Sequence, residues 1–500
     1  MSPSATIRKR FHAPYLDGIR GLAALSVVYS HSQNLYYQNL FYNTYNMIGQ
    51  AGVHCFFVLS AFLLVYRGLG EWETWMDSRR DKMEERQGYE PVRLVGAEEA
   101  DVELGDRTAP EGDIDSTVSP QPHKLVSNPT ARSRLSGLIS LWTTHGDPVR
   151  IWMRFMLRRV MRVYIPYIVL LLLIAYFEPI SFAYGHIITP QNLQGHLSLR
   201  VAEFIFWSIP PEMEFYLYIP LIVIGYDLLS RLGVHLSRRT HRFSPTMGRW
   251  SGRALGLLIL LFVESYFLYT REVQNPHKLS GTAQYFLSGS VAAILFHEAM
   301  RLDWIPLSEQ EEKELEQETK VKSIATSGFA AHIVALLPTR HQAFRLSWDI
   351  ANYGIFILCL ATMPLLQKKI LHFGVYMELE WLAGGGLYAS LILTGLFSRD
   401  GSFVNAVTWS LLRFSGKVSF GIYLLHPIAF MYVNTIPSVG PLAADLLQSP
   451  ADKANVQFDA VCLSFAASLA LGWVFHYLVE KPSMKVAEAV AKRWLVVKKA

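Results

Sequence analysis

Long apolar stretches alternate with short polar segments along most of this chain. Each stretch has about 20 residues, the length that an α-helix needs to cross a hydrocarbon core of roughly 30 Å. The predicted spans cover residues 16–33, 47–66, 160–177, 211–229, 254–270, 281–299, 348–366, 381–397, 418–434 and 458–478. In lipid, only helices satisfy every backbone hydrogen bond within such a segment. The pattern therefore predicts an all-α fold, a polytopic membrane helix bundle with about ten transmembrane helices.

Basic side chains gather in every second loop. Three of them precede the first predicted span, six lie in residues 230–253, and six more follow the last span from Lys481 onward. The intervening loops are poor in them, with none in 34–46, one in 179–208 and one in 435–457. Cytoplasmic loops of membrane proteins carry an excess of Lys and Arg. Both termini are therefore predicted to be cytoplasmic, as an even number of spans also requires, and the protein is expected to be a multi-pass membrane protein.

Composition divides the chain into four parts. Residues 71–147 hold 16 acidic against 9 basic side chains, with few aromatic ones, which favours a disordered cytoplasmic insertion. Residues 1–70 then form the N-terminal tail and the first two spans, and residues 148–482 form the other eight. Residues 483–500 form a basic cytoplasmic tail. Without the insertion the net charge rises from +5 to +12, so the membrane part is basic.

The overall composition narrows the class of protein. Apolar residues make up 51% and charged residues 17% of the sequence, whereas soluble domains average about 25% charged residues. Because Cys55, Cys359 and Cys462 all fall in predicted spans, we expect no disulfide framework, and no metal-ligand spacing occurs. The basic surplus suits phospholipid headgroups and an anionic cofactor. We therefore expect membrane lipids, and no nucleic acid, as partners.

The first span, YLDGIRGLAALSVVYSHS in residues 15–32, carries three ionisable side chains. Arg20 and His31 are eleven residues apart, so they share one helix face and lie about 16 Å apart along the axis. Asp17 precedes Arg20 by one turn. Ionisable groups inside a membrane face other helices or a water-filled cavity, which predicts a functional face. In the alternative interpretation Arg20 reaches the membrane surface and pairs with Asp17, and His31 marks the helix end.

Further polar side chains lie in or beside five other spans. The segments are GVHCFFVLSAFLL (52–64), RRVMRVYIPY (158–167), FWSIPPEMEFYLYIP (206–220), SGKVSFGIYLLHPIAF (415–430) and YLVEKP (477–482). Together with the first span, they resemble acyltransferase family 3, the integral membrane acyltransferases of the O-antigen acetylase type, in the order of that family's motifs. The sequence departs from the family pattern at Ala61, usually glycine, at Phe420, commonly tyrosine, and at the Pro210–Pro211 pair before Glu212.

The resemblance implies transfer of an acyl group, often acetyl, from acyl-coenzyme A to a hydroxyl. His31 is the candidate general base, because histidine titrates near neutral pH. Glu212 is predicted on the same side of the membrane as His31, so it is the candidate carboxylate that orients the imidazole. Arg20, the other member of the first-span motif, completes the candidate catalytic set.

Arginines at the cytoplasmic ends of the spans are the candidate ligands of the coenzyme. Arg158 and Arg162 are neighbours on one helix face and, with Arg20 and the adjacent Asp17, form the candidate cofactor site. Arginine recognises phosphate through a planar fork of several donors, and the coenzyme carries phosphates. These arginines could instead serve only as a positive-inside anchor.

The candidate substrate-binding residues are His426, Trp207, Tyr216 and Ser60, which lie in the matched segments. Each also has a structural interpretation. Trp207 and Tyr216 fit the aromatic belt at a membrane interface, while His426 and Ser60 could be packing residues of the bundle. The resemblance leaves open the acceptor, which could be a sugar, a glycan, a small metabolite or a lipid, and also the acyl chain length.

Two other classes of function are compatible with a buried polar face. A transporter or permease of a small anionic or polar solute would also bury charges, but such proteins are commonly built from inverted repeats and broken helices, and the sequence shows no internal repeat. A receptor or scaffold would use the acidic segment to bind partners. Glu264, an acid inside the span 254–270, has no partner assigned by the sequence.

Overall fold

The computed structural model describes most of the predicted membrane part of the chain. The described residues are 14–36, 42–86, 147–201, 203–240, 244–270, 278–302, 338–361, 385–398, 401–439 and 449–494. Most of the predicted disordered insertion, residues 87–146, and the end of the basic tail, residues 495–500, lie outside this description.

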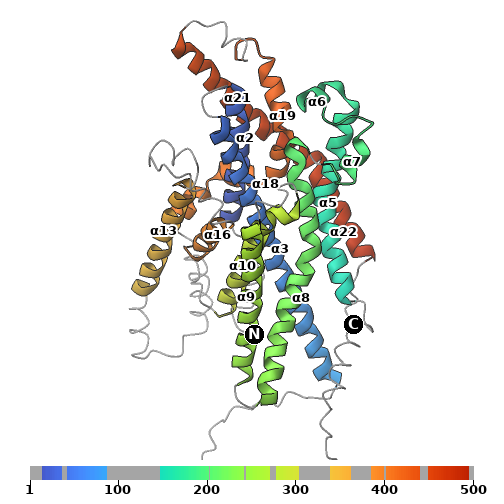
Figure 1. Ribbon diagram of the computed structural model, residues 1–500, viewed down its shortest axis with the longest axis vertical. Helices are drawn as coiled ribbons and strands as arrows, with labels where there is room; N and C mark the ends of the chain where they lie inside the picture. The colour runs from blue at the N-terminus through green and yellow to red at the C-terminus, as the bar shows by residue number, and fades with distance from the viewer. Residues whose placement is uncertain are drawn as a thin grey trace, which may run out of the picture.

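The described residues contain helices and no strand (Figure 1). The helices are α2 (Pro14–Tyr36), α3 (Tyr42–Arg86), α5 (Asp147–Tyr176), α6 (Glu178–Ala183), α7 (Leu193–Leu197), η1 (Phe204–Ser208), α8 (Ile209–Thr240), α9 (Pro245–Thr270), α10 (Leu279–Arg301), α13 (Pro338–Ala361), α16 (Gly386–Ser398), α17 (Ser402–Val407), α18 (Ser410–Lys417), α19 (Ser419–Asn434), α21 (Pro450–Phe475), the π-helical turn η4 (His476–Glu480) and α22 (Lys481–Trp494).

Each predicted span falls on one of these helices, and the prediction of an all-α polytopic membrane bundle is confirmed. Six of the described stretches are long and apolar enough to cross a membrane, and two shorter apolar helices lie in α13 and α16. The first predicted span, α2, carries charged side chains, and the ninth, α19, has only 16 residues. Figure 1 shows α6 and α7 at the top of the bundle and the C-terminal ends of α3 and α8 at the bottom. The charge pattern requires these elements to lie on opposite sides of the membrane.

Helix α3 is longer than the sequence pattern predicted. It continues to Arg86, so the first part of the predicted insertion is helical rather than irregular. Its extension packs at its base, where the Trp72 indole N–H donates to Asp227 of α8 at 3.0 Å and the Trp72 ring lies 5.0 Å from that of Trp75. The composition of this extension indicated disorder because it is strongly charged. A helix can nevertheless carry charged side chains on the faces that do not pack against the protein.

Helix α2 is held by very close contact with the short helix α18. A Cβ atom added at Gly21 would overlap the carbonyl oxygen of Leu412, and one added at Gly416 would overlap that of Asp17. Small residues let helix backbones approach in this way inside membranes, where packing rather than hydrophobicity drives helix association. The contact flanks Arg20 and fixes the part of α2 that carries it.

Helices α8, α9 and α10 form a second unit through glycines and a buried ion pair. The backbones of α8 and α9 touch at Gly233 and Gly248. Arg253 of α9 pairs with Glu298 of α10 at 2.7 Å, and both side chains are buried. Glu264 accepts a hydrogen bond from Ser288 of α10, which supplies the partner that the sequence left unassigned.

The connection from α5 to α8 folds over one end of the bundle. Hydrogen bonds from two tyrosine hydroxyl groups hold it there. Tyr164 donates to the carbonyl oxygen of Leu197 at 2.5 Å, and Tyr184 donates to that of Leu424 at 2.5 Å. His196 of α7 is fully buried, and this burial lowers the pKa of its imidazole. The connection therefore packs as a cap over α5 and α19.

We predict that Gly21→Ala destabilises the protein while Gly70→Ala does not. A Cβ atom at Gly70 meets no atom within 4 Å, and alanine is a better helix former than glycine by about 1 kcal/mol. At Gly21 the added methyl group separates α2 from α18, and overpacking of this kind costs about 1–3 kcal/mol. Thermal unfolding of the purified proteins in detergent measures the difference. Equal melting temperatures for the two variants would show that the α2–α18 contact is not tight.

Candidate active site

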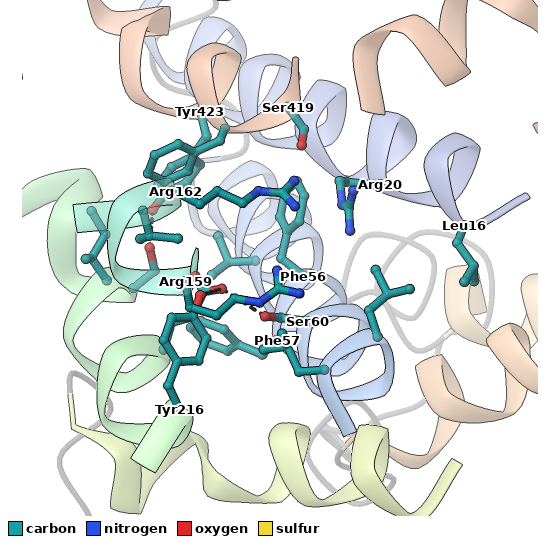
Figure 2. A pocket seen from close by; sticks show the side chains of 18 of the residues that line it. Leu16, Arg20, Phe56, Phe57, Ser60, Arg159, Arg162, Tyr216, Ser419 and Tyr423 are labelled. Atoms are coloured by element: carbon teal, nitrogen blue, oxygen red, sulfur yellow. Dashed lines mark hydrogen bonds between the residues drawn. The ribbon is translucent and has the colours of Figure 1, made fainter. Parts of the chain in front are cut away.

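A cavity of about 260 Å³ lies between α2, α3, α5, α8 and α19. Four arginines line it, from three helices: Arg20, Arg67, Arg159 and Arg162. We call it the arginine pocket. Figure 2 shows the Arg20, Arg159 and Arg162 side chains reaching toward the same space, with Ser60 and Tyr216 on one side and Tyr423 and Ser419 on the other.

The middle of α5 supplies two of these arginines, but not the predicted pair. Arg159 and Arg162 are one turn apart and line the pocket. Arg158, one residue earlier, points elsewhere and pairs with Glu71 of α3 at 2.8 Å. Arg158, predicted to bind the cofactor, therefore lies outside the arginine pocket, and Arg159 lines the pocket instead.

Arg67 is a member of the pocket that the sequence did not single out. It follows Ser60 by seven residues, which is two helical turns, so both side chains lie on one face of α3. Arg67 is exposed at the mouth of the pocket and interacts electrostatically with Arg162 and Asp17. The i,i+7 spacing from a serine inside a span was the available signal.

Carboxylates partly balance this positive charge. Asp17 lies 3.7 Å from Arg20 on the same helix, the pairing that the alternative interpretation of the first span contained. Arg20 also interacts electrostatically with Glu212 and with Arg162. The four arginines of the pocket face only these two carboxylates among the residues that line it.

Glu212 lies in the first turn of α8, directly after Pro210 and Pro211. Proline is tolerated there because the first helical N–H groups have no acceptor in the helix. One carboxylate oxygen of Glu212 accepts hydrogen bonds from Ser60 Oγ at 2.8 Å and from the Tyr216 hydroxyl at 2.7 Å. Ser60 and Tyr216, predicted to bind substrate, thus both donate hydrogen bonds to Glu212.

His31 lies outside the arginine pocket, beside His426 of α19. The two ring centroids are 5.0 Å apart, and the Phe204 ring lies 5.9 Å from that of His31. No carboxylate of the described residues is paired with His31. Glu212, predicted to orient His31, instead accepts hydrogen bonds from Ser60 and Tyr216 in this structure.

The ring of His426 is held in one tautomer. Its Nδ1 lies 2.8 Å from the carbonyl oxygen of Tyr423, which can only accept, so Nδ1 carries the proton. Its Nε2 then has a free lone pair, and this atom is buried with no hydrogen-bond partner among the described residues. His426 thus presents a buried proton acceptor next to His31.

Phe204, the aromatic neighbour of His31, has a backbone φ of 53°. Bulky residues adopt this conformation only under strain, and such strained residues cluster at functional sites.

Tyr423 connects the arginine pocket with the two histidines. It lines the pocket, its ring lies 6.3 Å from that of His426, and its hydroxyl contacts Ser208 Oγ at 2.9 Å. The same hydroxyl donates to the carbonyl oxygen of Ile205. Trp207 belongs neither to the lining of the arginine pocket nor to the histidine pair. Its ring lies 6.0 Å from that of Phe57, which lines the pocket.

The structure thus sorts the predicted site residues into three groups. The arginine pocket contains Asp17, Arg20, Ser60, Arg162, Glu212 and Tyr216. The second group is the histidine pair, His31 and His426. Arg158 and Trp207 lie outside both.

We predict that Glu212→Ala destabilises the protein more than Glu214→Ala. Removing the Glu212 carboxylate leaves the Ser60 and Tyr216 hydroxyls without their acceptor, at a cost of about 1–3 kcal/mol for a buried group. Glu214, two residues later, is exposed and has no such partner among the described residues. Thermal unfolding of both variants in the same detergent is the measurement. Matching melting temperatures would mean that the Glu212 network does not hold α8 to α3.

Comparison with known proteins agrees with the motifs. Residues 13–82 and 135–477 match the family profile Acyl_transf_3, described as "Acyltransferase domain". No curated protein and no solved structure matches the chain. The profile covers well over half of the sequence, and its unmatched residues 83–134 fall within the predicted insertion. The chain therefore belongs to this acyltransferase family 3 and is a multi-pass membrane O-acyltransferase.

Proposed function

We propose that the protein transfers an acyl group, acetyl in the simplest case, from acyl-coenzyme A to a hydroxyl of a carbohydrate or small molecule. The observation that supports this is the arginine pocket, with its four arginines against two carboxylates. Such a surplus of guanidinium groups favours a polyanionic ligand. Arginine binds phosphate through two parallel charge-assisted hydrogen bonds.

The arginine pocket would hold only part of the coenzyme. Its volume of about 260 Å³ lies below the range of roughly 300–1,000 Å³ that is usual for drug-sized ligands. Arg67 is exposed at the mouth of the pocket, on the predicted cytoplasmic side, where a ligand made in the cytoplasm would enter. The phosphates would therefore meet Arg67 first, with Arg20, Arg159 and Arg162 behind it.

The histidine pair would perform the proton transfer. The acceptor hydroxyl oxygen attacks the thioester carbonyl carbon, and its proton passes to the imidazole of His31. The carbon–sulfur bond breaks, and the leaving thiolate takes the proton back from the imidazolium, so that the ester and free coenzyme A are formed. His426 lies beside His31 and has a free Nε2 lone pair. This lone pair can accept a share of the proton that His31 takes up.

We predict that Arg162→Gln weakens the binding of free coenzyme A and that Arg158→Gln does not. The lost charge-assisted hydrogen bonds cost about 1.5–3 kcal/mol, which corresponds to about a ten- to hundredfold rise in Kd. Arg158 is the matched control, because it belongs to the same helix turn but pairs with Glu71. Isothermal titration of the detergent-solubilised full-length variants measures both dissociation constants.

Two outcomes of this titration would contradict the proposal. One is coenzyme A binding that Arg158→Gln weakens as much as Arg162→Gln does. The other is no binding of coenzyme A to the wild-type protein at all, which would favour a transported anion as the ligand of the arginine pocket.

We predict that His31→Gln abolishes acyl transfer and leaves coenzyme A binding unchanged. General base catalysis contributes about 10²–10⁴-fold in rate, and His31 lies outside the arginine pocket. Extracts of cells that carry wild-type or His31→Gln protein at equal membrane abundance are compared by mass spectrometry. We expect small molecules or glycans heavier by one acyl group in the wild-type extract only, which also identifies the acceptor.

Phe204→Leu serves as the control for this comparison, since it changes a neighbour of His31 without removing a titratable group. We expect acyl transfer to be reduced but measurable in this variant. If the acylated product persists in the His31→Gln cells at the wild-type level, His31 is not the base.

A further inference from the structure

A second cavity lies between α8, α9 and α10 and belongs to no part of the site described above. Its volume is about 580 Å³, and its walls are almost entirely apolar or aromatic, with Ile222, Leu260, Ala283 and Leu287 among them. We call it the lipid-facing groove. Helix α9 forms one of its walls. Only 17% of the residues in the most apolar part of α9 are buried, so this side of the bundle faces the bilayer.

The groove is long enough to hold the hydrocarbon chain of a lipid in one leaflet. Along α8 its lining runs from Glu214 to Leu229, fifteen residues or about 22 Å of helix. Half of a hydrocarbon core of roughly 30 Å is about 15 Å. Nothing lies within 4 Å of a Cβ atom added at Gly225, on this path, so the groove is open at that position.

The charged side chains that line the groove lie at one end only. Glu214 at the start of α8 and Lys278 at the start of α10 are both exposed at this end, on the predicted non-cytoplasmic side. Neither side chain forms an ion pair or a hydrogen bond with another described residue. An acid and a base at the mouth of an apolar groove complement a headgroup that carries both a phosphate and an ammonium group.

We propose that the lipid-facing groove binds one acyl chain of a zwitterionic phospholipid from the non-cytoplasmic leaflet. The chain packs along α8 past Gly225, the phosphate meets Lys278, and the ammonium group meets Glu214. The lipid is bound as a ligand at a defined position.

The lipid-facing groove is a separate site from the arginine pocket. Phe215 lines the groove and Phe57 lines the pocket, and both rings pack against Phe286 of α10, at 4.5 Å and 4.7 Å between centroids. This aromatic layer divides the two cavities. The binding of a lipid chain therefore needs no part of the catalytic proposal and is tested independently of it.

The test uses a phosphatidylcholine with a photoreactive diazirine in the middle of one acyl chain. Purified full-length protein is reconstituted in phosphatidylcholine vesicles with a trace of this probe, illuminated, and mapped by mass spectrometry. We expect labelling to concentrate on the groove walls, at Ile222 and Leu287, above that on Phe262. Phe262 is 75% exposed on α9, so random contact with lipid would label it more than the groove walls.

The matched pair of variants is Gly225→Leu and Gly354→Leu. Both glycines lie inside helices with nothing within 4 Å of an added Cβ atom, but only Gly225 lines the groove, and Gly354 lies on α13. We expect Gly225→Leu to lower groove labelling roughly tenfold, the affinity that about two buried methylene groups supply. Gly354→Leu should leave it unchanged. Labelling that is greatest on Phe262 or insensitive to Gly225→Leu overturns the proposal.

The headgroup is tested by exposed variants that leave the helix packing intact. A phosphatidylglycerol probe with the same chain lacks the ammonium group, so we expect it to label the groove several-fold less than phosphatidylcholine. Glu214→Gln should remove this difference, and Lys278→Gln should lower the labelling by both probes. Equal labelling of the wild-type groove by the two probes overturns the assignment of a zwitterionic headgroup.

Discussion

The placement of four arginine side chains inside a membrane bundle constrains the rest of this structure. Positive groups that leave water lose hydration, and they repel one another more strongly where the dielectric constant is low. Asp17 and Glu212 offset part of this cost, and the arginines come from three different helices, which spreads them around the cavity. A surplus of positive charge remains, so an anion in the pocket would stabilise the folded state as well as bind to it.

The elements around the arginine pocket keep its members in position. The α2–α18 contact fixes the turn of α2 that carries Arg20, and the Ser60–Glu212–Tyr216 hydrogen bonds tie α3 to the start of α8. Glu212 therefore contributes both charge and geometry. Its carboxylate balances arginines while its hydrogen bonds hold two helices, which explains why it is unavailable to His31.

The sequence predicted the helices and singled out four of the six charged side chains that line the arginine pocket, because hydropathy and motif spacing are local properties. It failed where the rotation of a helix about its axis decides the outcome. Arg158, Arg159 and Arg162 lie within five positions of one another on α5. Only the orientation of α5 in the bundle determines that Arg158 pairs with Glu71 while the other two line the arginine pocket. The partner of Glu212 depends likewise on how α8 meets α3. The helical extension of α3 was missed because its charge composition is that of a disordered segment.

The length of α3 has a mechanical consequence. The helix has 45 residues, about 67 Å, which is more than twice the roughly 30 Å of a hydrocarbon core, and no proline interrupts it. Ser60 and Arg67 lie on the same rod as the turns that end at Arg86. A displacement of that outer end would therefore tilt the rod as a lever. The lever would shift one wall of the cavity relative to α2 and α5, so an event in the cytoplasm could widen or narrow the entrance without any ligand entering the membrane.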